Sequence, residues 1–123
     1  MLAGIGTDIV EIGRIKKACA NDRFLARVFT AQERAYCESR GAGRFASYAA
    51  RFAGKEAVMK ALGTGLRGGR LLEIEILPDA LGAPQVTLTG AFHALAVHQG
   101  IRAARISLSH AREYATAVCV LEK

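Results

Sequence analysis

The longest helical pattern of the sequence runs from residue 44 to residue 62, and it limits most strongly how this chain can fold. When successive residues are placed about 100° apart, alanines and large apolar side chains gather on one arc of this helix. The turn Gly63-Thr64-Gly65 ends the pattern. We therefore predict a long central helix that packs through this arc against the rest of the chain.

Shorter elements are predicted before and after this helix. Alternating apolar and β-branched residues indicate a strand at 2–10. Asn21 can cap one helix, and Thr30 with Glu33 forms a capping box that begins another. The second half is mainly β, with one helix that ends at Gly100. The other boundaries are helices at 12–20, 30–41 and 91–99 and strands at 72–77, 85–88, 105–109 and 114–121. The predicted fold class is α+β, with helices packed on a small antiparallel sheet.

The composition limits the class of protein. The chain has 123 residues, of which 51% are hydrophobic and 23% charged, which predicts one globular domain over residues 1–123 and excludes a disordered protein. No apolar run approaches the roughly 20 residues that span a bilayer, and the N-terminus lacks the pattern of an export signal. The three cysteines are far apart and form no metal-binding pattern. We expect a cytoplasmic protein with reduced thiols and no membrane contact.

Positive charge is concentrated in the first part of the chain. Residues 1–70 hold 13 basic and 6 acidic side chains, whereas residues 71–123 hold 4 and 5. Such a basic region favours an anionic partner, which can be a nucleic acid, a phosphate-bearing metabolite or an acidic protein. The chain has no Trp and no basic run interleaved with aromatic residues, so stacking on a nucleic-acid strand has little support. Nucleic acid therefore ranks below the other two partners.

Charged residues of the long helix form part of the strongest candidate site. On the helical wheel, Glu56 and Lys60 lie inside the apolar arc, whereas Arg44, Arg51 and Lys55 group on a different stripe. One interpretation of Glu56 and Lys60 is an ordinary surface ion pair one helical turn apart. Charges on a core-facing arc are costly unless a metal, a ligand or a network compensates them, which favours a functional site.

Asp8 is the other part of this candidate site. Its carboxylate stands in an otherwise apolar strand, although an Asp after Gly6-Thr7 is also typical of a turn or a helix cap. If the strand lies beside the long helix, Asp8 and Glu56 converge. Two carboxylates, completed by water and phosphate oxygens, are a usual way to hold Mg²⁺, and Lys60 would then face the same phosphate. These residues predict an Mg²⁺–phosphate site.

Two further candidates are weaker when they are judged on their residues alone. Gly63-Thr64-Gly65 permits close approach of the backbone to an anion, but the motif is short. His110 follows a predicted strand, where a lone histidine is more often a surface or turn residue. Ser109-His110 is not a triad signature, because no third partner has a readable position.

Several motifs together resemble the holo-acyl-carrier-protein synthases, the short members of the 4′-phosphopantetheinyl transferase superfamily. The opening GIGTDIVEI at residues 4–12 is similar to the first motif of this family. RFAGKEA at 51–57 and KALGTG at 60–65 are similar to its second and most specific motif. IEIL at 74–77, GAP at 82–84 and ISLSH at 106–110 also match in order and spacing, so the resemblance covers nearly the whole chain.

The resemblance implies an enzyme of fatty acid biosynthesis that moves the phosphopantetheine arm of coenzyme A onto a serine of an acidic apo acyl carrier protein. Asp8 and Glu56 would hold Mg²⁺, and Lys60 would neutralise charge on the departing phosphate. Glu56, or a water on the metal, would take the serine proton. The positions implied to bind coenzyme A are Arg51, Lys60, Gly63, Thr64, Gly65, Ser109 and His110. Those implied to bind the carrier protein are Arg14, Arg23 and Arg27.

The same resemblance implies the family's α+β fold and homotrimers with active sites between neighbouring subunits. Gly54 departs from the pattern, since alanine is common there, and it costs about 1 kcal/mol of helix propensity unless something packs closely against it. Two other functions stay open on the residues alone. One is a basic module that binds RNA or DNA, and the other is a non-catalytic subunit that binds coenzyme A or a carrier protein.

Overall fold

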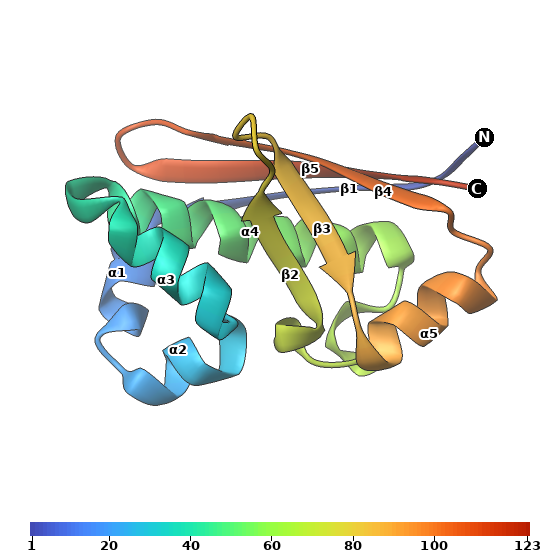
Figure 1. The fold of residues 1–123 in the computed structure, drawn as a ribbon, viewed down its shortest axis with the longest axis horizontal. Coiled ribbons are helices and arrows are strands. Elements are labelled where there is room, and N and C mark those ends of the chain that lie inside the picture. Colours follow the sequence, from blue (N-terminus) through green and yellow to red (C-terminus); the bar gives the residue numbers. More distant parts are fainter.

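The computed structural model describes residues 1–123 as an α+β fold, which confirms the predicted class (Figure 1). The strands are β1 (Leu2–Glu11), β2 (Ile74–Pro78), β3 (Pro84–Leu88), β4 (Ala103–His110) and β5 (Tyr114–Glu122). The helices are α1 (Ile12–Cys19), α2 (Asp22–Val28), α3 (Ala31–Ser39), α4 (Arg44–Leu62) and α5 (Gly90–His98). Three short 3₁₀ turns are η1 (Gly41–Gly43), η2 (Gly65–Gly68) and η3 (Leu71–Glu73).

The strands form two antiparallel sheets. One sheet has the order β1-β5-β4, and the other is the β2–β3 hairpin. The first and last strands of the chain are therefore neighbours, with Leu2 opposite Glu122, and both chain ends lie on the same side of the molecule (Figure 1). The strand predicted at 72–77 begins later than expected, because Leu72 and Glu73 belong to the 3₁₀ turn η3.

The long helix α4 lies across one face of the three-stranded sheet and contacts β1, so the condition for Asp8 and Glu56 to converge is met (Figure 1). Close contact depends on glycine in β1, since a Cβ on Gly6 would lie 2.7 Å from the backbone nitrogen of Ala61 and against the carbonyl oxygen of Ala57. Helices α1–α3 cover one end of α4, and α5 packs near the other (Figure 1). None of these helices combines the length and apolarity that a membrane crossing needs.

Gly54 allows a second close contact of α4. A Cβ at this position would lie 2.6 Å from Cδ1 of Ile76 in β2 and 3.0 Å from Cδ1 of Ile106 in β4. A methyl group there would overlap the core, so side chains from both sheets occupy the space that alanine would need. The close packing that would justify a glycine at position 54 is therefore present.

Candidate active site

Asp8, Glu56 and Lys60 meet where β1 contacts α4. Asp8 lies within β1, and the Lys60 ammonium donates to its Oδ1 at 3.1 Å and to the carbonyl oxygen of Thr7 at 3.0 Å. Glu56 lies one helical turn before Lys60. Burial, and next the nearby Asp8 carboxylate, raise the pKa of Glu56 above its usual value. The two carboxylates predicted to converge are therefore neighbours.

The structure excludes two alternatives for these residues and corrects one expectation. Asp8 is neither a turn residue nor a helix cap, because β1 continues on both sides of it. Lys60 is not buried on the core-facing arc, since 55% of its side chain is exposed. Its ion pair is with Asp8, whereas Glu56 takes part in none of the ion pairs of the chain. Glu56 is therefore a half-buried carboxylate outside any ion pair, and the nearby Lys60 charge only partly offsets the rise of its pKa.

The Asp8 and Glu56 carboxylates fit a hard divalent cation. Their repulsion would be relieved by a cation between them, and carboxylate oxygens are the ligands that Mg²⁺ prefers. No third His, Cys, Asp or Glu joins them in a cluster. The protein would thus supply two ligands, and water or phosphate oxygens would supply the others, which is usual for Mg²⁺.

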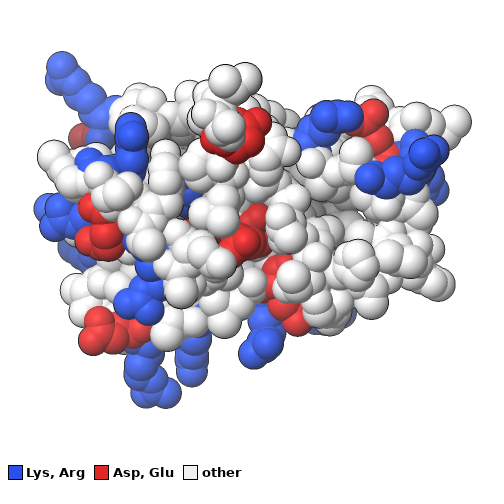
Figure 2. Space-filling view, viewed as in Figure 1, with Lys and Arg blue, Asp and Glu red and all other residues white.

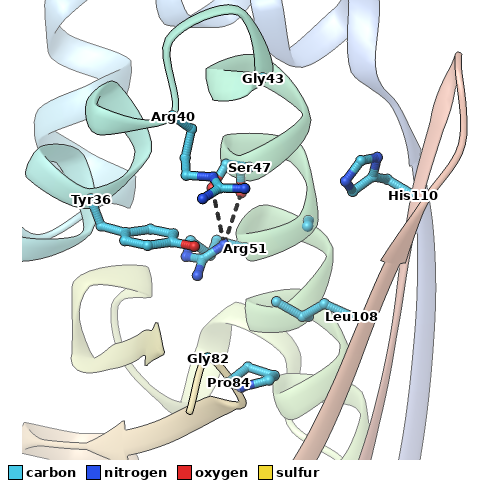
Figure 3. A pocket seen from close by; sticks show the side chains of 10 residues that line it. Tyr36, Arg40, Gly43, Ser47, Arg51, Gly82, Pro84, Leu108 and His110 are labelled. Atoms are coloured by element: carbon cyan, nitrogen blue, oxygen red, sulfur yellow. Dashed lines mark hydrogen bonds between the residues drawn. The ribbon is translucent and has the colours of Figure 1, made fainter. Parts of the chain in front are cut away.

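A second group of predicted residues lines a cavity of about 360 Å³ (Figure 3). The Arg51 side chain is almost completely buried, its Nε donates to the carbonyl oxygen of Ile76 at 3.2 Å, and one terminal nitrogen donates to Oγ of Ser47 at 3.1 Å. His110, at the end of β4, lines the same cavity from another side (Figure 3). The structure therefore brings Arg51 and His110 together, as the resemblance implies.

Sequence reasoning missed two other residues of this cavity. The Arg51 guanidinium lies 4.5 Å from the ring centroid of Tyr36, and Arg40 lines the opening nearby (Figure 3). No acidic side chain lines the cavity. A cavity with two arginines, a histidine and no carboxylate suits an anion such as a phosphate group.

The two groups of predicted residues lie on opposite flanks of α4. Arg51 and Lys60 are separated by two and a half helical turns, so their side chains project about 180° apart around the helix. Arg51 reaches toward β2, whereas Lys60 reaches toward β1. A single subunit therefore does not join the carboxylate pair to the Arg51–His110 cavity.

The other predicted coenzyme A contacts are spread over both regions. Ser109 precedes His110 in β4, so its side chain faces the outer side of the sheet, away from the cavity. The turn after α4 contains Gly63 and Gly65, which have φ values of +81° and +58°. Thr64 lies between these glycines. The segment 63–65 follows directly after Leu62, the last residue of α4, and is therefore close in sequence to Lys60 in the last turn of this helix.

The arginines predicted to bind the carrier protein are all exposed. None of them takes part in an ion pair. Arg14 lines a cavity with the aromatic rings of Phe24 and Phe52. Residues 12–28 hold five basic side chains and one acidic one, and Figure 2 shows basic side chains gathered on this side of the molecule. The α1–α2 surface is therefore basic and is not neutralised by the chain itself.

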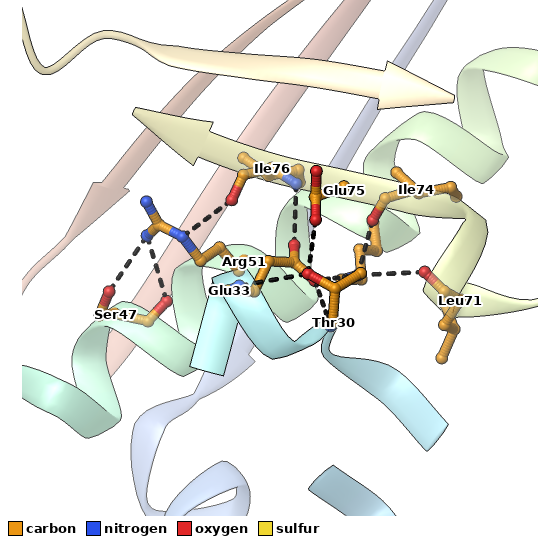
Figure 4. A network of polar contacts seen from close by, with 9 residues as sticks. Thr30, Glu33, Ser47, Arg51, Leu71, Ile74, Glu75 and Ile76 are labelled. Carbon is orange, nitrogen blue, oxygen red and sulfur yellow. Dashed lines mark hydrogen bonds and ion pairs between the residues drawn. The ribbon is translucent and has the colours of Figure 1, made fainter. Parts of the chain in front are cut away.

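Sequence reasoning also missed a buried ion pair on the flank of α4 that faces α3 and β2 (Figure 4). The side chains of Lys55 and Glu33 are both 0% exposed, and the ammonium donates to Oε1 of Glu33 at 2.8 Å. It also donates to the carbonyl oxygens of Leu71 at 3.0 Å and Ile74 at 2.6 Å. Oε2 of Glu33 accepts from the Ile76 amide at 2.8 Å. Every proton of the ammonium group thus has an acceptor.

Arg51 and Lys55 do share a flank of α4, as the helical wheel predicts, but that flank is buried at both residues. Arg44 is partly exposed, whereas Arg51 and Lys55 are buried because this stripe faces α3 and β2. Burial lowers the pKa of Lys55, and Glu33 opposes this change. The capping box at Thr30 identifies Glu33 as a helix-start residue, but no local pattern pairs it with a lysine 22 residues away.

Comparisons with known proteins agree with this geometry. The family model of the 4′-phosphopantetheinyl transferase superfamily matches residues 4–119. The holo-[acyl-carrier-protein] synthase of Ruminiclostridium cellulolyticum is 50% identical over 120 residues, which cover 95% of this chain and 90% of that protein. The protein of the same name from Chlamydia trachomatis is 49% identical over 124 residues, with 97% and 98% covered.

Two solved structures have the same fold. The holo-[acyl-carrier-protein] synthase of Neisseria meningitidis is 36% identical, with a TM-score of 0.91 over 100% of both chains. That of Helicobacter pylori, in complex with coenzyme A, is 34% identical, with a TM-score of 0.83 over 96% of this chain and 99% of the other. In sequence and in structure, the chain therefore belongs to the holo-acyl-carrier-protein synthases of the 4′-phosphopantetheinyl transferase superfamily.

Proposed function

We propose that this chain transfers the 4′-phosphopantetheine group of coenzyme A to a serine hydroxyl of an apo acyl carrier protein and releases adenosine 3′,5′-bisphosphate. The observation that carries this proposal is the meeting of Asp8 and Glu56 beside Lys60. Two carboxylates and an ammonium group suit a pyrophosphate that is held through a divalent cation. Relatives with 50% and 49% identity are named for this synthase activity.

Asp8, Glu56 and Lys60, at the β1–α4 contact, act together in the transfer. Asp8 and Glu56 would hold Mg²⁺, which would neutralise pyrophosphate charge when it is bound. Glu56 accepts the serine proton while the serine oxygen forms a bond to the phosphorus that carries the pantetheine arm. The bond from this phosphorus to the bridging oxygen breaks, and Lys60 neutralises the charge that develops on the departing bisphosphate.

Coenzyme A contacts extend beyond this centre. The Arg51–His110 cavity takes the adenosine bisphosphate end, because it is basic and Arg51 is held in place by Ile76 and Ser47. Lys60 and the turn at residues 63–65 lie beside the pyrophosphate. The side chain of Ser109 reaches coenzyme A only within an assembly, since it faces the outer side of the sheet.

The separation of the two regions supports a site shared between subunits. In one subunit α4 lies between the carboxylate pair and the Arg51–His110 cavity, so one coenzyme A molecule would need both flanks of the helix. We propose a homotrimer in which neighbours supply the two regions, as the family resemblance implies. Large apolar residues on the outer face of the sheet support self-association: Ile5, Ile9, Tyr114 and Val118 are exposed.

The carrier protein is proposed to bind the basic α1–α2 surface in the cytoplasm, without a nucleic acid or a membrane. Arg14, Arg23 and Arg27 are free of intramolecular carboxylate partners. Complementary charge at such a surface raises the rate of association with an acidic protein.

Mass spectrometry of the carrier protein tests the proposed reaction. The purified protein is mixed with an apo acyl carrier protein, coenzyme A and Mg²⁺. We expect the carrier to gain the mass of one phosphopantetheine group while an equal amount of adenosine 3′,5′-bisphosphate appears. An unchanged carrier mass with several acidic carriers would contradict the proposal.

Mixing two inactive variants tests the shared site. Glu56→Gln removes the carboxylate of one region, and His110→Glu places a negative charge in the basic cavity of the other. If neighbours supply the two regions, mixed oligomers contain some intact sites and recover activity that neither variant has alone. Mixed oligomers that stay inactive would place both regions in one subunit and overturn this arrangement.

A further inference from the structure

One edge of β2 is held by charged side chains instead of a neighbouring strand. β2 pairs only with β3, so the backbone groups on its other edge need partners from elsewhere. Lys55 donates to the carbonyl oxygen of Ile74 at 2.6 Å. The Ile76 amide donates to Oε2 of Glu33 at 2.8 Å, and the Ile76 carbonyl oxygen accepts from Nε of Arg51 at 3.2 Å (Figure 4). Three charged side chains of α3 and α4 thus bind this edge.

Ile76 connects the buried ion pair to the Arg51–His110 cavity. In a β-strand, the amide and the carbonyl group of one residue point toward the same edge. Glu33 and Arg51 therefore bind the same residue side by side, one through its amide and the other through its carbonyl oxygen. The carboxylate that fixes the Ile76 amide also determines where Arg51 finds its acceptor.

Glu33 is a rigid anchor for this edge of β2. Its side chain is completely buried, and its Oε1 accepts from the Lys55 ammonium at 2.8 Å and from the Thr30 amide at 2.9 Å. Its Oε2 is bound to Ile76. Because donors from two helices and a strand hold this carboxylate, it has no room to turn away, and the Ile76 peptide is fixed with it.

Arg51 keeps one terminal nitrogen available for a ligand. Nε is bound to Ile76, and Nη1 donates to Ser47. No hydrogen bond joins Nη2 to the chain. Every fully buried side-chain nitrogen or oxygen atom has a partner, so Nη2 is accessible, and the cavity is the space that Arg51 lines. The direction in which Nη2 points depends on how the planar guanidinium group is held, and therefore on Ile76.

We propose that Glu33 is a positioning residue for coenzyme A: through the Ile76 peptide it holds Arg51 in the orientation that binds the anionic adenosine bisphosphate end. This inference rests on the proposed function. Glu33 does not line the cavity, so it acts only through Arg51, and Lys55 holds Glu33 in place. An arginine that is oriented before the ligand arrives binds at a lower entropic cost. If the ion pair only stabilised the fold, the affinity of the folded protein for coenzyme A would not depend on it.

The double variant Lys55→Met/Glu33→Leu separates these two roles. It leaves no unpaired charge in the core, so it should fold, but its Ile76 amide has no acceptor. We expect the Kd for coenzyme A, measured by calorimetric titration without a carrier protein, to rise about tenfold, because a charge-assisted hydrogen bond is misdirected. The kcat at saturating coenzyme A should stay within about twofold. Lower stability alone would reduce the number of active molecules and leave the Kd unchanged.

Glutamine at position 33 provides a matched comparison. In Lys55→Met/Glu33→Gln the side-chain oxygen can accept from the Ile76 amide, and we expect most of the affinity for coenzyme A to return. In Glu33→Gln alone, Lys55 attracts this oxygen, so the side-chain nitrogen faces the Ile76 amide, and we expect the Kd to rise at least about threefold. Equal Kd values for leucine and glutamine in the Lys55→Met background would contradict the role of the Ile76 amide.

Arg51→Gln shows whether the effect passes through Arg51. This variant should bind coenzyme A more weakly, and the addition of Lys55→Met/Glu33→Leu should weaken binding no further. Val97→Ser, at a position on α5 that is 62% exposed, and Leu121→Val, in the core face of β5, are the surface and core controls and should bind as the unmodified protein does.

Two results would overturn the inference. One is an unchanged Kd in the folded double variant Lys55→Met/Glu33→Leu, and the other is an equal further weakening when these changes are added to Arg51→Gln. Both are read from binding alone, so they do not depend on product formation. An unmodified protein that binds coenzyme A but transfers nothing would contradict the proposed function and not the positioning by Glu33.

Discussion

Two lysines of α4 show how the surroundings of a charge determine its role. Lys55 is completely buried, and its ammonium group donates hydrogen bonds to Glu33 and to the carbonyl oxygens of Leu71 and Ile74. Lys60 is 55% exposed and lies beside Asp8 on the other flank of the helix. At Lys55, on the α3–β2 flank, the chain itself supplies the counter-charge and the hydrogen-bond acceptors, which fixes the fold. On the β1 flank Glu56 takes part in no ion pair, so that a ligand can complete the site.

Lys55→Met should give the largest effect and tests the structural side of this comparison. The substitution leaves Glu33 charged and buried and removes a donor from two carbonyl oxygens. We expect the free energy of unfolding to fall by about 3–5 kcal/mol, as measured by urea denaturation. Where the variant is folded, its kcat should stay close to that of the unmodified protein.

The double variant Lys55→Met/Glu33→Leu is the control for this prediction. Removal of the unpaired carboxylate should recover part of the lost stability, since an apolar pair can replace a buried ion pair. A single Lys55→Met variant as stable as the unmodified protein would contradict the assignment of this pair to the fold.

Lys60→Met should have the opposite profile. Because the Lys60 side chain is mostly exposed, the loss of its ion pair should change the free energy of unfolding by less than about 1 kcal/mol. Turnover should fall on the order of 100-fold, because the charge on the departing phosphate is no longer neutralised. The same denaturation and transfer assays measure both quantities, and retained turnover would remove Lys60 from the reaction.

Gly54→Ala sharpens the comparison at the face of α4 that contacts both sheets. Alanine favours helix formation, yet its Cβ would lie 2.6 Å from Cδ1 of Ile76. We expect overpacking to prevail and the free energy of unfolding to fall by about 1–3 kcal/mol. A more stable variant in thermal or urea denaturation would show that the contact relaxes and that helix propensity decides.

Glu73 extends the comparison to a carboxylate near the surface. The amides of Arg70 and Ala91 donate to it, and these hydrogen bonds lower its pKa below 4.5. A lowered pKa in the folded state means that the contribution to stability is present above pH 4.5 and is lost as the pH falls through the lower value. We expect Glu73→Gln to destabilise by less than about 1 kcal/mol at pH 7. Urea denaturation near pH 3 should show a smaller difference, and a larger one there would contradict this sign.

Local signals explain how much of the fold could be predicted from the sequence. The caps at Asn21 and Thr30 and the left-handed Gly63 and Gly100 depend on neighbouring residues, and the structure has them where they were predicted. The sequence predicts a strand at Leu72, which lies in a 3₁₀ turn. A run of apolar residues is compatible with both structures, so the pattern alone does not tell them apart.

The candidate site was predictable only in part, for a related reason. The proximity of Asp8 and Glu56 is predictable because it depends on a single contact, the packing of β1 against α4. The pairing of Lys55 with Glu33 depends on how α3, α4 and β2 pack, and no spacing in the sequence encodes that packing. The helical wheel predicts that Arg51 and Lys60 project from opposite sides of α4. It does not predict that Arg51 faces β2 and Lys60 faces β1.

The carboxylate pair is tested most directly by counting Mn²⁺ ions bound in the presence of coenzyme A by electron paramagnetic resonance. The unmodified protein should bind one ion per chain through Asp8, Glu56 and the pyrophosphate. The double variant Asp8→Asn/Glu56→Gln should remain folded and lose this ion, whereas Val97→Ser should retain it. Equal binding by the double variant and the unmodified protein would show that the divalent cation lies elsewhere.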